Sequence, residues 1–230
     1  AGEFGFVRMG GTIGWVIASW PFVFLLQDKT GPELVERTSW IFLVAGIASL
    51  VMAGFSLTLP HTPPQPASQG IDRLAWLKAA RLLTVPYILV LYIVTLIDAT
   101  IHNGFFAVTD RFLTYRVEIS PNLSMLVMSL GQVAEILTML VLGLVLKRLG
   151  WKWTMIIGVL GHALRFSVFA FFPDSVWLIV AIQLVHGICY AFFFATVYIF
   201  VDEVFPKDVR SSAQGLFNLL ILGVACIGAG

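Results

Sequence analysis

The sequence predicts an all-α membrane protein, a polytopic helical bundle with about seven transmembrane helices. Hydrophobic residues make up 59% of the 230 residues, and charged residues make up only 12%. The mean hydropathy of +0.92 is far above the range of soluble domains. Apolar runs long enough to cross a bilayer as helices recur along the chain, separated by polar segments. We therefore expect the lipid bilayer as the surrounding medium, and a net charge of +1 gives no reason to expect nucleic acid as a partner.

Seven apolar runs are the candidate spans, and each approaches the length that a helix needs to cross the hydrocarbon core. In chain order they are Phe6–Leu26, Trp40–Leu59, Pro86–Val108, Leu123–Leu146, Thr154–Phe172, Val176–Val201 and Ala213–Gly230. The chain begins at Ala1 and stops inside its last apolar run, so we expect a fragment of a longer protein.

The longest polar segment, residues 61–85, separates two spans from five. Its first part, His61–Gly70, is rich in proline and is typical of a linker. Its second part, Ile71–Leu83, has the residue spacing of an amphipathic helix. A short helix on the cytoplasmic surface and a disordered tether are both compatible with this pattern.

Lysine and arginine are distributed unevenly between alternate loops. Four follow the first, third and fifth spans, whereas eight follow the second, fourth and sixth. Because cytoplasmic loops carry more of these residues, we expect the amino end and the 61–85 segment in the cytoplasm. The eight residues are Arg73, Lys78, Arg81, Lys147, Arg148, Lys152, Lys207 and Arg210.

Ionisable side chains lie in the middle of several spans. Glu135 lies 12 residues before Lys147, and Arg165 lies 12 residues after Trp153, at the inner ends of their spans. At 1.5 Å per residue, both are about 18 Å from the inner boundary, near the midplane of a core about 30 Å thick. Asp98 and His186 fall at a similar depth. Ionisable groups are costly at this depth and usually serve function, so we expect a polar cavity at the midplane.

Each of these groups also has a structural interpretation. Glu135 could form a structural ion pair with Arg165 in place of a functional role. For Arg165, which has His162 three residues before it, the structural ion pair is the favoured interpretation. Asp98 is either a hydrogen-bonding partner or a proton site. His186 is either a packing residue or the best available proton relay.

Two motifs resemble the major facilitator superfamily. Residues 4–15, with Arg8 before two spaced glycines, are similar to the Arg-x-x-Gly-x-x-Gly stretch that opens the fifth helix of its lactose-permease-like and nucleoside-permease-like branches. Residues 143–152 resemble its cytoplasmic loop motif Gly-x-x-x-Asp-Arg-x-Gly-x-Lys/Arg, with Lys147 in place of the aspartate. The resemblance implies a partial major facilitator fold that covers helices five to eleven of a twelve-helix transporter.

This register divides the chain into three parts. Residues 1–60 would be the last two helices of an N-terminal bundle, residues 61–85 the cytoplasmic central linker, and residues 86–230 a truncated C-terminal bundle.

Within the superfamily, the chain resembles the nucleoside:proton symporter family most. The eighth helix of that family carries a Gln-x-x-Glu pair, and its seventh carries a polar pair that ends in Asn. The resemblance implies a pocket in which amides and a carboxylate bind ribose hydroxyls and base edges, and aromatic rings stack on the base. The substrate-binding residues that it implies are Arg8, Thr12, Trp15, Thr100, Asn103, Gln132, Glu135, His186 and Tyr190.

The coupling proton is expected on Glu135, Asp98 or His186. The family pattern has an acid immediately after the position of Tyr190, where this chain has Ala191. One of the three other groups therefore has to carry the proton, or coupling is altered.

We accordingly expect a permease that takes up nucleosides by proton symport with alternating access. No catalytic residue, cofactor or metal is expected, since the motifs His-Glu-x-x-His and Gly-x-Ser-x-Gly are absent from the sequence. A sugar:proton symporter of the same superfamily is one alternative. A seven-helix receptor or an intramembrane enzyme is the alternative from a different class. We expect a multi-pass monomer in the cytoplasmic (inner) membrane of a bacterium, with a nucleoside and a proton as its partners.

Overall fold

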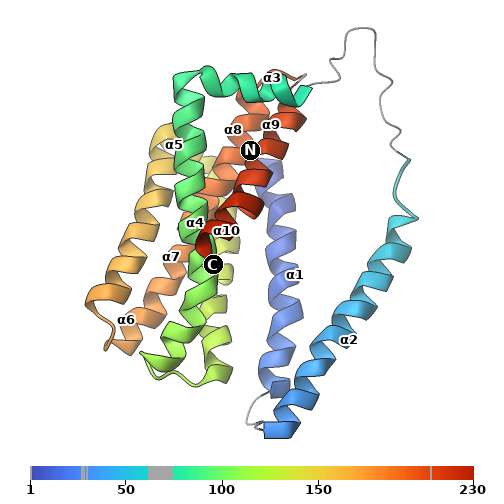
Figure 1. Ribbon diagram of the computed structural model, residues 1–230, viewed down its shortest axis with the longest axis vertical. Coiled ribbons are helices and arrows are strands. Elements are labelled where there is room, and N and C mark those ends of the chain that lie inside the picture. The colour runs from blue at the N-terminus through green and yellow to red at the C-terminus, as the bar shows by residue number, and fades with distance from the viewer. Residues whose placement is uncertain (1, 27–28, 30, 62–74, 208) are drawn as a thin grey trace.

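The computed structural model describes residues 2–26, 29, 31–61, 75–207 and 209–230, and every regular element within these ranges is helical (Figure 1). The elements in chain order are α1 (Gly2–Leu26), α2 (Gly31–Ser56), α3 (Ala75–Arg81), η1 (Leu82–Thr84), α4 (Pro86–Tyr115), α5 (Pro121–Phe171), α6 (Val176–Ala181), η2 (Ile182–Leu184), α7 (Val185–Cys189), η3 (Tyr190–Ala195), α8 (Thr196–Val204), α9 (Arg210–Asn218), η4 (Leu219–Val224) and α10 (Ala225–Ala229). The segments from α6 to α8 and from α9 to α10 each run on as one long helix that contains a π-helical stretch, η3 or η4. The expected all-α bundle is confirmed.

Six helices within the described ranges are long and apolar enough to cross a membrane. One of them, α5, has 51 residues, which at 1.5 Å per residue is about 76 Å and more than twice the hydrocarbon thickness. It reverses at Gly150, whose φ of 71° and ψ of 175° lie in a region open essentially to glycine only. The two legs of α5 are the fourth and fifth expected spans. The expected loop Lys147–Trp153 is therefore helical on both sides of one reversing residue.

Two helices are longer than their apolar runs predicted. α2 begins at Gly31 rather than Trp40, and α4 ends at Tyr115 rather than Val108. Hydropathy marks where a chain leaves the hydrocarbon. A helix, by contrast, continues into the polar layer because it keeps its backbone hydrogen bonds satisfied internally.

Of the two alternatives for the second part of the 61–85 segment, the short helix is present as α3, followed by the single turn η1. α3 packs against α9 and lies across the end of the bundle (Figure 1). Ala79 is buried and Trp76 is exposed, so the helix has two different faces. Of the proline-rich stretch His61–Gly70 that we expected as a linker, residues 62–70 lie outside the described residues.

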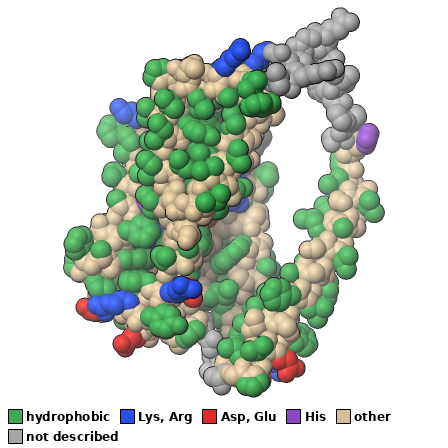
Figure 2. All heavy atoms as spheres, viewed as in Figure 1, with side chains coloured by type: hydrophobic (Ala, Val, Ile, Leu, Met, Phe, Trp, Pro, Cys, Tyr) green, Lys and Arg blue, Asp and Glu red, His purple; other side chains and the backbone are tan. Residues whose placement is uncertain are grey.

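The first two helices are placed very differently. α1 packs against α5, whereas α2 stands apart from the bundle in Figure 1 and has no buried residue. Its side chains form part of the apolar surface visible in Figure 2. α1 therefore forms the contact between the first two spans and the remaining described helices.

Glycines bring both legs of α5 against α7. A Cβ on Gly187 would lie 2.4 Å from a backbone carbonyl carbon of α5, and a Cβ on Gly131 would lie 2.9 Å from Cβ of His186. On the second leg, a Cβ on Gly161 would lie 2.8 Å from Sγ of Cys189. Small residues allow helices in lipid to pack this closely. The polar side chains of both legs consequently lie beside the same turns of α7.

Candidate functional site

A cavity of about 240 Å³ lies between α1, α4, the first leg of α5 and the α7–η3 segment. Its walls are polar and aromatic. Some lining residues lie on α1, and the others lie on α4, α5 and the α7–η3 segment. The lining residues are Arg8, Gly11, Thr12, Trp15, His102, Phe106, Gln132, Glu135, His186 and Tyr190. The structure thus brings together all the expected substrate-binding residues except Thr100 and Asn103.

A larger hollow of about 790 Å³ lies between α4 and the second leg of α5. Its lining is almost entirely apolar, with Lys152 and Tyr87 as the polar exceptions. A ligand rich in hydroxyls and amides would leave most of its hydrogen bonds unmade there, so the smaller polar cavity is the candidate site.

Arg8 of α1 and Tyr190 of η3 close one side of the cavity. The Nε of Arg8 donates a hydrogen bond of 3.0 Å to the Tyr190 hydroxyl, and its Nη2 donates a second, shorter one. The guanidinium carbon also lies 5.0 Å from the centroid of the Tyr190 ring. This arrangement fixes a planar cation against an aromatic ring at the edge of the cavity.

Glu135 of α5 also lines the cavity and is 5% exposed. The Thr12 hydroxyl donates a 2.7 Å hydrogen bond to Oε1 of Glu135, which joins α1 to α5. One turn earlier, Gln132 is also buried, and its Oε1 has no hydrogen-bond partner. A buried carbonyl oxygen without a partner is costly, so it is available to accept a hydrogen bond from a ligand.

His102 and Phe106 line the cavity although they were not among the expected substrate-binding residues. The ring of His102 stacks on that of His186, with centroids 5.1 Å apart and planes 22° from parallel. Phe106 meets both rings edge to face. The spacing of Asp98, His102 and Phe106 at i, i+4 and i+8 is a signal that could have placed them on one face of α4.

Thr100 and Asn103 do not line the cavity, unlike the other residues expected to bind substrate. The Asn103 amide donates a 2.9 Å hydrogen bond to the backbone carbonyl of Ile221 in η4, and the Thr100 hydroxyl donates one to the carbonyl of Leu96. Both side chains lie on the face of α4 that packs against η4 and α10, since a helix turns about 100° per residue and His102 occupies the face toward the cavity. Asn103 serves the packing of the last span.

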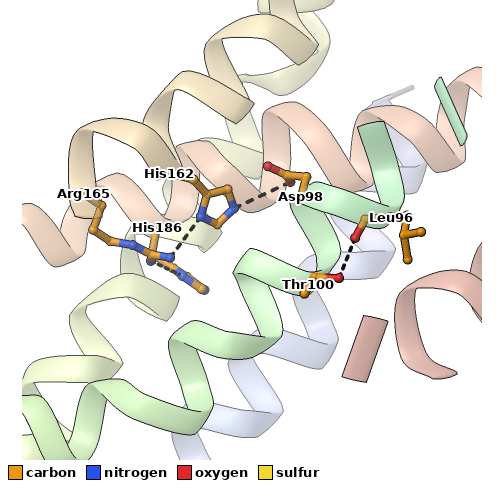
Figure 3. Close-up of polar contacts among 6 residues, drawn as sticks. All are labelled: Leu96, Asp98, Thr100, His162, Arg165 and His186. Carbon is orange, nitrogen blue, oxygen red and sulfur yellow. Dashed lines mark hydrogen bonds and ion pairs between the residues drawn. The ribbon is translucent and has the colours of Figure 1, made fainter. Parts of the chain in front are cut away.

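Arg165 lies at the centre of a second polar group, drawn in Figure 3. It is fully buried, and it forms hydrogen bonds with Nδ1 of His186 at 2.8 Å and with Nδ1 of His162 at 3.1 Å. Its guanidinium carbon lies 3.7 Å from the centroid of the Phe105 ring. The expected ion pair with Glu135 is not formed, because Arg165 is on the second leg of α5 and faces α4 and α7, while Glu135 faces α1.

Asp98 ends this group on α4. Its Oδ2 lies 3.6 Å from Nε2 of His162, and neither of its oxygens has a hydrogen-bond partner. Asp98 and His162 also line a hollow of about 530 Å³ beside α4 and the second leg of α5. Within the described ranges, no three His, Cys, Asp or Glu side chains are grouped to hold a metal ion.

The chain matches the model of the family described as nucleoside H+ symporter over residues 1–230. It is 30% identical to the nucleoside permease NupG of Escherichia coli strain K12 over 97% of this chain and 54% of the relative. It is 29% identical to the xanthosine permease of the same organism over 95% of this chain and 53% of the relative.

The same likeness holds for the fold. A crystal structure of the nucleoside transporter NupG superposes with a TM-score of 0.65 at 26% identity, covering 96% of this chain and 56% of that one. The chain thus spans about half the length of the curated relatives that it matches.

Proposed function

The chain belongs to the nucleoside H+ symporter family, and from that premise we propose that the full-length protein takes up nucleosides by proton symport with alternating access. The family is one of transporters and not of enzymes, and the chain is a multi-pass integral membrane protein. The proposal therefore concerns the substrate, the coupling proton and the residues that bind them.

The observation that carries the proposal is the cavity between α1 and the helices of the 86–230 part. Transporters of this kind bind substrate where two helical units meet, near mid-membrane, and they rock about the bound ligand. The cavity combines a guanidinium, a carboxyl, an amide and several aromatic rings. These groups match a nucleoside, which offers ribose hydroxyls, base amides and a flat ring.

Each wall has a distinct role in this proposal. Gln132 and Glu135 bind ribose hydroxyls or base edges through their free oxygens. Trp15 and Tyr190 supply flat surfaces for stacking, with His186 beside them. Arg8 and Thr12 orient Tyr190 and Glu135 through the hydrogen bonds already described.

Alternating access would act on the contacts that α1 makes with the other helices. These are Arg8 with Tyr190, Thr12 with Glu135, and a 3.1 Å hydrogen bond from the Trp20 indole to Ser129. Rocking of one unit against the other has to break some of these bonds on one side of the cavity. A ligand that takes over the polar groups of the cavity lowers the cost of that step.

The proton would be carried by Glu135, Asp98 or His186. Ala191 follows Tyr190 in η3, is fully buried and has no titratable group. The coupling of this chain therefore has to rest on other groups.

We further propose a two-bundle arrangement, a monomeric state and a bacterial membrane location. Residues 1–60 and 86–230 belong to two bundles joined by the 61–85 linker, and the protein works as a monomer in the inner membrane of a bacterium. The curated relatives from Escherichia coli and the six candidate membrane helices support this setting.

The test is counterflow of radiolabelled uridine in proteoliposomes that contain the full-length protein. We expect exchange of uridine in the wild type, its loss in Glu135→Gln, and its retention in the matched surface variant Glu36→Gln, since Glu36 is exposed on α2. Absence of uridine exchange in the wild type would refute the substrate class. Competition by lactose and not by unlabelled uridine would identify a sugar permease instead.

A further inference from the structure

Resting on the proposed function, we propose that Asp98 binds the coupling proton in this chain and that Arg165 transmits the charge of Asp98 to the pocket through His186. The elements involved are α4, the second leg of α5 and α7 (Figure 3). The coupling proton would then bind outside the ligand cavity, in a polar cluster that reaches the cavity at one residue, His186. The cluster consists of Asp98, His162, Arg165 and His186.

A proton can be added to Asp98 without breaking a hydrogen bond. The residue is 1% exposed, and neither of its carboxyl oxygens has a hydrogen-bond partner. Glu135 differs, because its Oε1 already accepts a hydrogen bond from Thr12. Buried carboxyls without hydrogen-bond partners are rare because they cost folding free energy. We therefore infer a functional role for Asp98.

Arg165 excludes its two histidine partners as the proton carriers. A guanidinium has donors and no acceptor, so Nδ1 of His162 and Nδ1 of His186 must both accept from Arg165. Each ring is then held neutral with its hydrogen on Nε2, and protonating Nδ1 would break its bond to Arg165. For His162, the Nε2 hydrogen faces Asp98, whose Oδ2 is 3.6 Å away. His162 therefore positions Asp98 relative to Arg165 and does not itself carry the proton.

The cluster reaches the pocket through His186, which both bonds to Arg165 and lines the cavity. With Asp98 ionised, the charges of Asp98 and Arg165 balance in the membrane interior. When a proton from the external water binds Asp98, the charge of Arg165 is left uncompensated beside His186. The Nε2 hydrogen of His186 becomes a stronger donor, so a nucleoside binds more tightly. Release of the same proton to the cytoplasm restores the balance and weakens binding.

Two further titratable groups face Asp98 and have to be separated from it by experiment. His102 lies one turn further along α4, 5.6 Å from the His162 ring, and its Nδ1 has no hydrogen-bond partner. The Cys189 thiol of α7 lies within electrostatic range of both Asp98 and Arg165. His102, Cys189, His162 and Arg165 are therefore the titratable or charged groups that surround Asp98.

The experiment measures the Kd of uridine for the purified full-length protein as a function of pH. In the wild type we expect the affinity to fall with rising pH, by about 5–150-fold as in other coupled binding sites. Asp98→Asn removes the carboxylate at constant shape, so we expect tight binding that no longer changes with pH, and uridine counterflow without proton movement. Asp98→Glu should restore part of the pH dependence. The surface variant Asp174→Asn should behave as the wild type, because Asp174 is exposed and pairs with Arg116.

A second pair of variants tests the positioning role of His162 and does not depend on Asp98→Asn folding. His162→Gln keeps a neutral N–H group beside Asp98 but cannot hold a proton, so it should keep the pH dependence of the uridine Kd, whereas His162→Leu should lose it. Loss of the pH dependence in His162→Gln as well would make His162 the proton carrier and would overturn the proposal.

Other outcomes also decide against the proposal. An unchanged pH dependence of the uridine Kd in Asp98→Asn would place the proton elsewhere. If that dependence is instead lost in Glu135→Gln, His102→Gln or Cys189→Ser, the residue replaced is the proton carrier. These results would leave the nucleoside permease itself intact. Failure of the wild type to bind uridine would instead refute the proposed function.

Discussion

The hydroxyl of Thr12 and the carboxyl of Glu135 are joined by a 2.7 Å hydrogen bond that links α1 to the first leg of α5 at the wall of the cavity. This bond makes the orientation of the carboxyl depend on the position of α1. The affinity of Glu135 for a ligand therefore depends on whether α1 is packed against α5.

Replacing Thr12 by valine keeps the side-chain shape and removes the donor. Hydrogen bonds to charged groups contribute about 1.5–3 kcal/mol, so the Kd of uridine should rise by about 10–150-fold. Thr12→Ser keeps the hydroxyl and is the matched control. Equal affinities in Thr12→Val and the wild type, measured by equilibrium binding, would show that this bond does not orient the carboxyl.

Tyr190 is expected to contribute through its ring more than through its hydroxyl. Tyr190→Phe loses the hydrogen bonds from Arg8 but keeps the stacking surface, so we expect a rise in the uridine Kd of about fivefold, or about 1 kcal/mol. Tyr190→Ala also removes the ring, and aromatic stacking on a base is worth about 1–3 kcal/mol, so its Kd should rise further. A larger effect of Tyr190→Phe than of Tyr190→Ala in the same binding assay would contradict the stacking role.

Gly187 is expected to be intolerant of any side chain. A Cβ there would lie 2.4 Å from the backbone of α5, so Gly187→Ala must push α7 away from the first leg. Overpacking of this kind costs about 1–3 kcal/mol and should lower the Tm of the detergent-solubilised protein. Gly215→Ala in α9 is the control, because its Cβ would meet nothing within 4 Å. Similar Tm values for both variants would show that the close packing is not required.

Asn103 should affect stability and leave binding alone. Its amide donates to the carbonyl of Ile221 in η4, and Asn103→Ala removes this hydrogen bond between α4 and η4. An ordinary hydrogen bond contributes about 0.5–1.5 kcal/mol, so the Tm should fall while the uridine Kd stays constant. A changed Kd with an unchanged Tm would restore Asn103 to the binding site.

Much of this architecture was accessible from the sequence because lipid imposes a strong length rule on apolar runs. The runs predicted the helices and the positions of Glu135, Arg165 and Asp98 along them. They could not give the direction in which each side chain faces, since depth along a helix says nothing of rotation about its axis. Thr100 and Asn103 share the depth of His102 but lie on another face of α4.

The partner of Arg165 was not accessible for a related reason. Depth alone allowed a pair with Glu135, but the glycines at positions 131 and 161 set which side chains meet on α7. Close approach of the two legs of α5 to α7 places His186 against Arg165. That contact depends on how separate helices pack, which no local pattern encodes. The contact with His162, three residues earlier on the same helix, follows from helical spacing.

The most direct test of the central claim records uridine entry and internal pH together in proteoliposomes that contain the full-length protein. With no imposed gradient except uridine outside, nucleoside:proton symport predicts that uridine entry acidifies the interior in the wild type and that both signals are lost in Glu135→Gln. Uridine entry without acidification in the wild type, or no uridine entry at all, would contradict the account.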